Sequence, residues 1–152
     1  AMKAVDFSKY KEVVFCGFGE PTEALDVLKQ SAKLIKEKYN MPIRINTNGL
    51  VDFINPAFDS YKMRYLIDCI SISLNAPDPE SYLEVSRPKF GLPSFNSMLN
   101  FAATVKTIVP EVMFTVVDII KPEQIEQCKE LAEGLGIPLR VRHWVTDNES
   151  YT

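Results

Sequence analysis

A short apolar run near the start of the chain is followed by residues that could bind a ligand. Val13, Val14 and Phe15 are typical of a strand buried on both faces, and Gly17-Phe18-Gly19-Glu20-Pro21-Thr22 comes soon after them. Glycine lets a backbone turn sharply and approach a ligand closely, and Glu20 adds a carboxylate. A turn of this kind could bind a ligand, or it could simply connect a strand to a helix.

Each later apolar run is also followed by polar residues. If the strands are parallel, their carboxyl ends share one edge of the sheet, and that edge is where α/β proteins bind ligands. The polar groups are Thr47 to Gly49, Ser71 to Asn75, Asp118, and Arg140 to His143. Any one group could be an ordinary turn, but together they predict a shared site.

Ser71 and Ser73 are two residues apart and share one face of an expected strand. Burying two hydroxyl groups costs free energy unless each of them is hydrogen-bonded. A structural partner could satisfy either serine. We expect Ser73 to line a ligand site, because inward faces near the carboxyl ends of such strands line sites.

Arg140 and Arg142 share one face of the last expected strand, and two interpretations of the pair stay open. They could be a solvent-facing pair on an edge strand. They could also clamp a carboxylate or phosphate, which guanidinium groups bind in a two-pronged manner. His143 is the only histidine, and no carboxylate or cysteine partner for it is recognisable, so we expect a structural role.

The cysteines argue against both a disulfide framework and a metal site. Cys16, Cys69 and Cys128 are odd in number and widely spaced, and each lies in an apolar pattern, so we expect buried, inert thiols and a cytoplasmic protein. No zinc-ligand spacing is present. Tyr61, Tyr65 and Phe95 fit core or surface positions better than a platform for stacking bases.

The composition of the 152 residues is that of one ordinary globular domain. Hydrophobic residues make up 46% and charged residues 24%, with a net charge of -3. No apolar run approaches the roughly 20 residues of a membrane span, and no basic stripe indicates nucleic-acid binding. Ala1-Met2-Lys3 does not open a signal peptide.

Strands and helices are expected to alternate along the chain. Five strands are expected to begin at Val13, Ile43, Ile67, Val112 and Leu139. The expected helices include one from Thr22 to about Tyr39, one over 79–85, one with its N-cap at Ser94 or Asn96, and one from Pro122 to Gly134 or Gly136. This order predicts an α/β fold with a mostly parallel, twisted sheet of about five strands. Residues 50–66 are irregular, with one short helix expected after Pro56. The two prolines of 86–93 predict a long loop that is either mobile or substrate-facing.

These motifs together resemble the radical S-adenosylmethionine (radical SAM) superfamily. Gly17-Phe18-Gly19-Glu20-Pro21-Thr22 is similar to its Gly-Gly-Glu-Pro motif, Thr47-Asn48-Gly49 to its Thr-Asn-Gly, and Ser71 to Ala76 to its Ser-Leu-Asn ending. The subgroup most alike is that of the TatD-linked radical SAM proteins. The matching segments are Asp78-Pro79-Glu80, Ser86-Arg87-Pro88 and Val141-Arg142-His143.

The resemblance implies a single domain over residues 1–152, containing the second to sixth strands of a (β/α)6 partial TIM barrel. It implies S-adenosylmethionine and a [4Fe-4S] cluster as cofactors of the intact parent protein, and a 5′-deoxyadenosyl radical as the species that attacks an unknown substrate. We expect neither cofactor to be bound in this chain alone. The implied cofactor-binding positions are Gly17, Gly19, Glu20, Thr47, Asn48, Ser73, Asn75, Asp118 and Arg142. Gly17 to Glu20 would contact the amino group, and the strand ending at Asp118 would pass near the adenine. That strand lacks the family's glycine-spaced motif.

One departure from the family is large, because the chain has no Cys-x3-Cys-x2-Cys. We expect a fragment of a radical SAM enzyme that is inactive alone and whose partner is a missing N-terminal segment of the same protein. We expect no metal ligands and no catalytic residues in this chain. The alternative is a non-catalytic module that binds an adenosyl ligand or a protein, including a second copy through an exposed edge strand.

Overall fold

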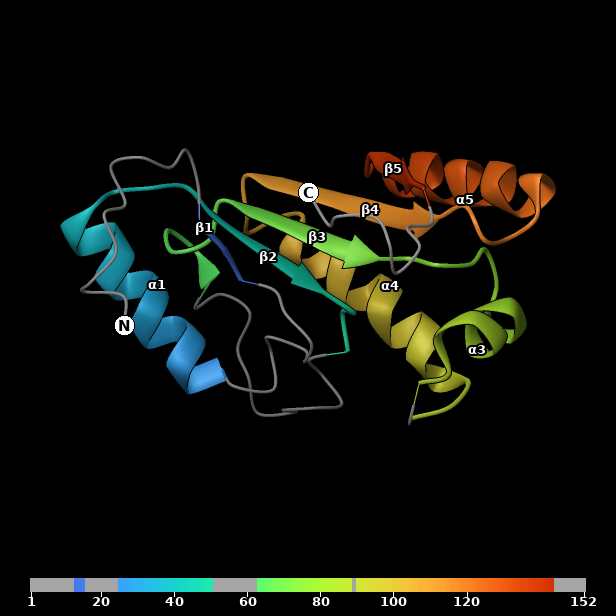
Figure 1. Cartoon of the computed structure of the whole chain (residues 1–152), viewed down its shortest axis with the longest axis horizontal. Coiled ribbons are helices and arrows are strands. Elements are labelled where there is room, and N and C mark those ends of the chain that lie inside the picture. The colour runs from blue at the N-terminus through green and yellow to red at the C-terminus, as the bar shows by residue number, and fades with distance from the viewer. Residues whose placement is uncertain (1–12, 16–24, 51–62, 89, 144–152) are drawn as a thin grey trace, which may run out of the picture.

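The computed structural model describes residues 13–15, 25–50, 63–88 and 90–143, which form a parallel sheet with helices (Figure 1). The strands are β1 (Val13–Phe15), β2 (Ile43–Thr47), β3 (Cys69–Ser73), β4 (Glu111–Val117) and β5 (Leu139–Arg142). The helices are α1 (Leu25–Lys38), α3 (Pro79–Ser86), α4 (Pro93–Val105) and α5 (Pro122–Leu135). The expected helix after Pro56 falls largely outside the described residues.

The five strands lie in the order β1-β2-β3-β4-β5, and every neighbouring pair is parallel. The predicted α/β fold with about five parallel strands is therefore confirmed. Since the strands are all parallel, their carboxyl ends point to one edge of the sheet. The register places Thr47 beside Ile72, and Ser73 beside Thr115.

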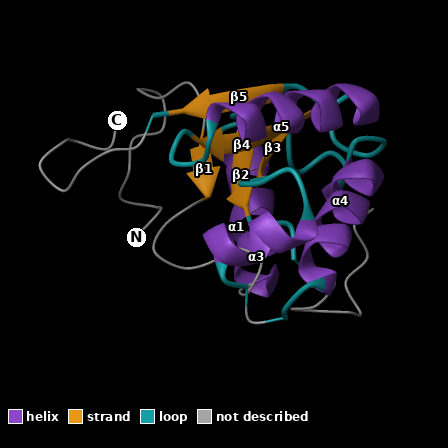
Figure 2. Cartoon of the chain, turned by 90° about the vertical axis from the view of Figure 1, so that its right-hand side faces the viewer, coloured by secondary structure: helices purple, strands orange, loops and turns teal. Residues whose placement is uncertain are grey.

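The helices gather on one side of the sheet (Figure 2). Burial agrees with this, because Ile45, Ile72 and Phe114 alternate along their strands with less buried neighbours and are themselves fully covered. A sheet wound in sequential order with helices on one face is the winding of a (β/α) barrel, whereas a doubly wound sheet reverses its order and carries helices on both faces. The opposite side, which we call the open face, carries alternating residues that include Arg44, Asn46, Ser71, Thr115 and Arg142.

The core lies between the sheet and its helices. Its fully or almost fully buried side chains include Ala32 and Ile35 of α1, Met98 and Phe101 of α4, and Cys128 and Ala132 of α5, which pack with Ile43, Ile70, Ile72, Phe114 and Val116 of the sheet. Gly49 tightens this packing just after β2. Its φ is +75°, and a Cβ there would lie 3.0 Å from Met98 Cγ and 3.1 Å from Ile72 Cγ2.

Polar contacts fix the ends of several elements. In the last turn of α1, Lys36 forms a salt bridge with Asp68, and Asp68 Oδ2 also accepts the amide of Ile43 at 2.7 Å. One carboxylate thereby ties a helix end to the start of β2. α5 ends at Gly136 with a φ of +67°, so of the two glycines expected to end it, Gly136 does so and Gly134 lies within the helix.

The expected start of α4 was wrong. The sequence predicted Ser94 or Asn96 as the N-cap, but the helix begins at Pro93 with Leu92 at the N-cap position and no side-chain cap. Proline at the first helical position has a suitable φ and lacks the N–H that would otherwise need a partner. Ser94 is instead fully buried, and its hydroxyl has no hydrogen-bond partner among the residues that the structure describes.

The loop predicted over 86–93 is shorter than expected. Ser86 ends α3, and Arg87 follows as its C-cap with a φ of +46°. Pro93 opens α4, which leaves 87–92 as the connection. In the described part of the chain, no helix is both long enough and apolar enough to span a membrane.

Candidate functional site: a polar hollow on the open face

A hollow of about 500 Å³ lies on the open face. It spans four strands, and most of its lining side chains are polar. They are Arg44 and Asn46 of β2, Ser71 of β3, Met113 and Thr115 of β4, and Arg140, Val141, Arg142 and His143 of β5 and its end. In a (β/α) barrel, the face away from the helices is the interior, so this hollow has the position of a barrel's inner wall.

The strand register arranges these residues in rows. Asn46, Ser71 and Met113 form one row across β2, β3 and β4. Ser73, Thr115 and Arg140 form the next row, two residues closer to the carboxyl ends of the strands. Arg142 lies one further row along, beside Val117. Successive rows are about 7 Å apart along the strands, given roughly 3.3 Å per strand residue. The rows therefore place hydrogen-bond donors at several distances from the carboxyl edge of the sheet.

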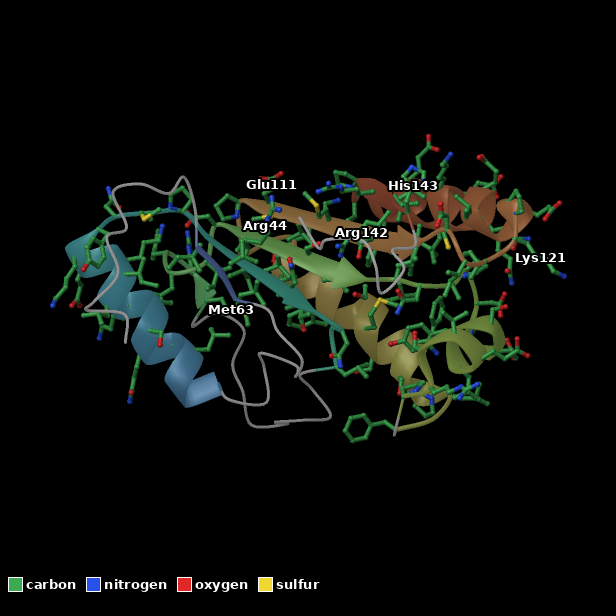
Figure 3. The ribbon with its side chains drawn as sticks, viewed as in Figure 1. Arg44, Met63, Glu111, Lys121, Arg142 and His143 are labelled. Atoms are coloured by element: carbon green, nitrogen blue, oxygen red, sulfur yellow. The ribbon has the colours of Figure 1, made fainter. Side chains whose placement is uncertain are left out.

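The two arginines of β5 both belong to the hollow. Arg140 and Arg142 are exposed and share its wall, and Arg44 contributes from β2. Figure 3 labels Arg44 and Arg142. From the sequence, this arginine pair could be either a solvent-facing pair on an edge strand or a clamp for an anion. β5 is an edge strand of the described sheet. Arg44 is not an edge charge, since β2 lies between β1 and β3.

His143 has a carboxylate partner, which corrects the expectation from sequence. Its Nδ1 lies 2.7 Å from Asp118 Oδ2, and the amide of Asp118 donates to the carbonyl of Arg142 at 3.0 Å. The two residues are 25 positions apart and meet only because β4 and β5 pair in parallel. The contact orients the imidazole at the rim of the hollow, and the His143 side chain is 93% exposed.

Ser73 lies on the open face at the carboxyl end of β3 and beside Thr115, but it is not among the residues that line the polar hollow. It is partly exposed, whereas Ser71 is buried within the hollow. The pair therefore shares one face, with Ser73 nearer the rim.

Thr47 and Asn48 are used by their own turn. Thr47 is buried and alternates with Arg44 and Asn46, so it faces the helices. Its Oγ1 accepts the amide of Gly49 at 3.0 Å, and Asn48 Oδ1 accepts the amide of Leu50 at 3.0 Å. These contacts shape the rim after β2.

Asn75 also makes a structural contact. Its Nδ2 donates to Ser86 Oγ at 2.8 Å, which links the end of β3 to the end of α3, and its φ of +67° lies in the left-handed region. Ser86 in turn hydrogen-bonds Tyr82, whose pKa is raised by burial and partly lowered again by that bond. Asn75 is thus a positioning residue for the β3 to α3 connection.

Some predicted residues lie outside the described part of the chain, and some residues of the hollow were missed. Gly17, Gly19 and Glu20 lie outside it. Arg44, Asn46, Met113 and Thr115 were read as parts of strands only. Their alternation with buried Ile43, Ile45, Val112 and Phe114 was visible in the sequence, and it assigns them to the face opposite the helices.

Cys69 and Cys128 are buried, as predicted, and neither is in a disulfide, while Cys16 lies outside the described residues. Cys69 shares the open face with Arg44 and Glu111, whereas Cys128 packs in the core from α5. Over the residues that the structure describes, no three His, Cys, Asp or Glu side chains are grouped to hold a metal ion.

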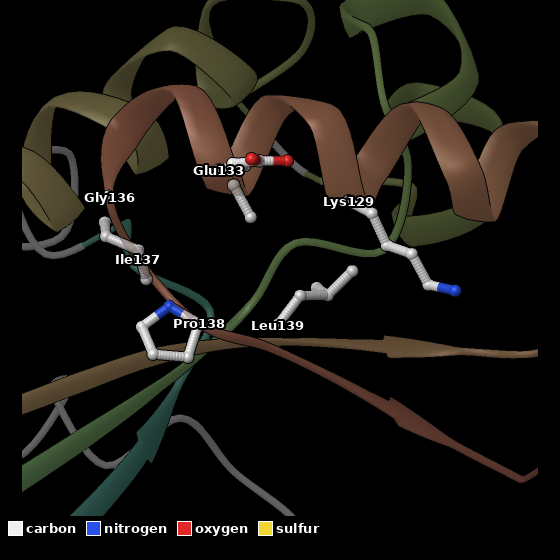
Figure 4. Close-up of a pocket in the computed structure, with 7 residues that line it drawn as sticks. Lys129, Glu133, Gly136, Ile137, Pro138 and Leu139 are labelled. Atoms are coloured by element: carbon white, nitrogen blue, oxygen red, sulfur yellow. The ribbon is translucent and has the colours of Figure 1, made fainter.

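A second hollow, of about 450 Å³, lies between α5 and β5 (Figure 4). Ala132, Ile137, Pro138 and Leu139 make much of its wall, with Lys129, Glu133 and Gly136 at its margin. It lies on the helix-covered side of the edge strand. It lacks the convergent donors of the polar hollow, so the polar hollow is the better candidate site.

Comparison with known proteins gives little beyond this geometry. No protein-family model matches the chain, and no curated protein matches it. Among solved structures, a radical SAM methyltransferase from Sphaerobacter thermophilus is similar, with a TM-score of 0.48 and 17% sequence identity. The alignment covers 88% of this chain and 51% of that one, so the chain spans about half the length of the methyltransferase. A likeness at this TM-score carries no weight for function.

Proposed function

We propose that the chain is the part of a radical SAM enzyme core that cradles S-adenosylmethionine. The supporting observation is the singly wound parallel sheet, which brings the motif residues Asn48, Ser73 and Asp118 to one edge. Sequence motifs that are weak one by one gain weight when the fold places them together. The sequence resemblance supplies the family.

The described residues fit an adenosyl ligand in part. Ser73 lies where its hydroxyl could hydrogen-bond the ribose or the carboxylate, and Asp118 and Arg142 lie further along the same rim. The amide of Asn75 and the hydroxyl of Thr47 are held by the protein, so these two residues would shape the cradle. Gly17, Gly19 and Glu20 would hold the ammonium group.

The residues do not fit the cluster that the family implies. Cys69 and Cys128 lie on opposite sides of the sheet, and the sequence contains no Cys-x3-Cys-x2-Cys. An iron–sulfur cluster needs several thiolates at close quarters. In a complete enzyme, S-adenosylmethionine and the cluster together supply the radical that attacks the substrate. We propose that the ligating segment belongs to a longer protein, and that this chain alone does not turn over.

Calorimetric titration with S-adenosylhomocysteine tests the cradle. The sequence resemblance predicts a bound cofactor only in the intact protein, whereas the proposed cradle predicts saturable binding by this chain. Ser73→Ala should weaken that binding about threefold to tenfold, the usual range for one hydrogen bond. Ser97→Ala on α4 is the matched control and should bind as the original chain does. Absence of binding, or equal loss in both variants, would remove the proposed cradle.

The alternative is a binding module that kept the sheet without the cluster, and the missing cysteine motif is the observation that favours it. The gene sequence preceding this chain separates the two proposals. A cysteine triad within roughly 40 residues, about the span of one βα unit, supports the enzyme core, and unrelated sequence supports the module. A cytoplasmic location belongs to either proposal, because neither described cysteine is in a disulfide.

A further inference from the structure

The polar hollow carries more positive charge than the proposed cradle requires. Arg44, Arg140 and Arg142 line it, and none of its described lining residues is acidic. Asp118 at its rim contacts His143. Neither Arg140 nor Arg142 forms a salt bridge with a carboxylate that the structure describes. The described wall is therefore a cationic surface without a protein counterion on β5.

We propose that this hollow binds an oxyanion group of the substrate, a phosphate or a carboxylate, between Arg140 and Arg142. The inference deepens the proposed function, on which it rests, by naming the substrate class. The geometry of β5 supports it. Residues two apart on a strand project to the same face with Cα atoms about 7 Å apart, so two guanidinium groups can converge on one oxyanion between them.

The neighbouring donors suit the same ligand. Thr115 lies beside Arg140 in the strand register, and Ser71 and Asn46 lie one row deeper in the hollow. Hydroxyl and amide groups at these positions can hydrogen-bond the oxygen atoms that the guanidinium groups do not reach. An oxyanion held in this way would have charged and neutral donors on two sides.

The competing explanation is that the arginines only protect an edge strand from pairing with another chain. Edge protection accounts for the exposed charges of β5 but not for Arg44, which lines the same hollow from a strand that is paired on both sides. Edge protection also does not explain why these positions are arginine and not lysine. Guanidinium forks match the oxygen spacing of phosphate and carboxylate, while an ammonium group is a point charge.

The test is titration of the chain with inorganic phosphate and with malonate, at constant ionic strength held by chloride. We expect saturable binding of at least one probe. Arg140→Gln combined with Arg142→Gln should weaken that binding at least tenfold. Both side chains are exposed, so the double variant should stay folded by circular dichroism. Arg140→Lys with Arg142→Lys keeps the charge and should lose affinity by a smaller factor.

Lys29→Gln with Lys33→Gln is the matched control. These lysines lie on α1, on the helix-covered side, and removing them takes away the same charge without touching the hollow. Failure of both probes to bind would overturn the proposal, as would equal weakening in the control.

Competition with S-adenosylhomocysteine is the second part of the test. If it displaces the bound probe, the hollow belongs to the cofactor and the substrate proposal is wrong, while the cradle stands. If it does not bind but phosphate or malonate does, the cradle is wrong and the oxyanion site stands.

Discussion

The thiol of Cys128 is held neutral by its surroundings. It lies fully buried on the inner face of α5, where burial and, as the smaller cause, the carboxylate of Asp78 together raise its pKa to about 11. Both causes disfavour a thiolate, the first by removing water and the second by placing negative charge nearby. Cys128 is therefore a packing residue, and its ionisation opposes folding.

The neutral Cys128 thiol predicts a stability that falls in alkali. The folded pKa of about 11 lies above the ordinary value of 9.0, so the contribution is fully present below pH 9 and is lost as the pH rises toward 11. The loss in the free energy of unfolding should be on the order of 2 kcal/mol. Urea unfolding at several pH values, compared between the original chain and Cys128→Ala, isolates this slope. Identical slopes in the two proteins would contradict the assignment.

At the scale of single residues, the sequence predicted some positions well and others poorly. Ser73 and Arg142 fall at strand ends on the open face, as strand periodicity alone requires. Asn75 could not be assigned correctly, because its partner Ser86 depends on how α3 folds back. The His143–Asp118 contact was invisible for the same reason, since it joins residues 25 positions apart through the register of two strands.

Elements in this chain begin and end through a few local contacts. Asp78 caps α3: its Oδ1 accepts the amide of Ser81 at 2.8 Å, and its Oδ2 accepts the Ser81 hydroxyl at 3.1 Å. Pro79 follows at the first helical position. Because α3 has only 8 residues, capping contributes a large share of its stability.

Removal of the Asp78 cap should therefore be measurable. Asp78→Ala should lower the free energy of unfolding by about 1 kcal/mol, since one helix amide loses its acceptor. Asp78→Asn keeps the cap and should cost less, and it also removes the charge that raises the Cys128 pKa. Urea unfolding gives the first effect, and the pH slope described for Cys128 gives the second. Equal destabilisation by both substitutions would mean that capping is not the cause.

Element types followed from sequence more readily than element ends. Short apolar runs, each followed by polar residues, located all five described strands. The start of α4 did not follow, since Ser94 has the residue type of a cap and is used as a buried helical residue. Residue type alone indicates which residues could serve as an N-cap. Which residue occupies the N-cap position of α4 depends on how the helix packs on the sheet.

Across the whole molecule, the winding of the sheet decides where chemistry could occur. Sequential parallel strands with helices on one side leave one face for ligands, and that face is polar near the strand ends. The sequence indicated the parallel sheet through its alternation of strands and helices. The composition of the open face was not predicted as a unit, because it draws single residues from strands far apart in the chain.

The same winding places the sheet between the two described cysteines, which predicts that they do not bind an iron–sulfur cluster together. Cys69 lies on the open face and Cys128 in the core on the other side, so these thiols cannot ligate one cluster without unfolding the sheet. Anaerobic reconstitution with iron and sulfide should leave no absorbance near about 400 nm after desalting, the region of thiolate-to-iron charge transfer. A known cluster protein, treated identically, checks the procedure. A stable, stoichiometric cluster would require other ligands or a second copy of the chain, and serine substitution of Cys16, Cys69 and Cys128 one at a time would then identify which thiols hold it.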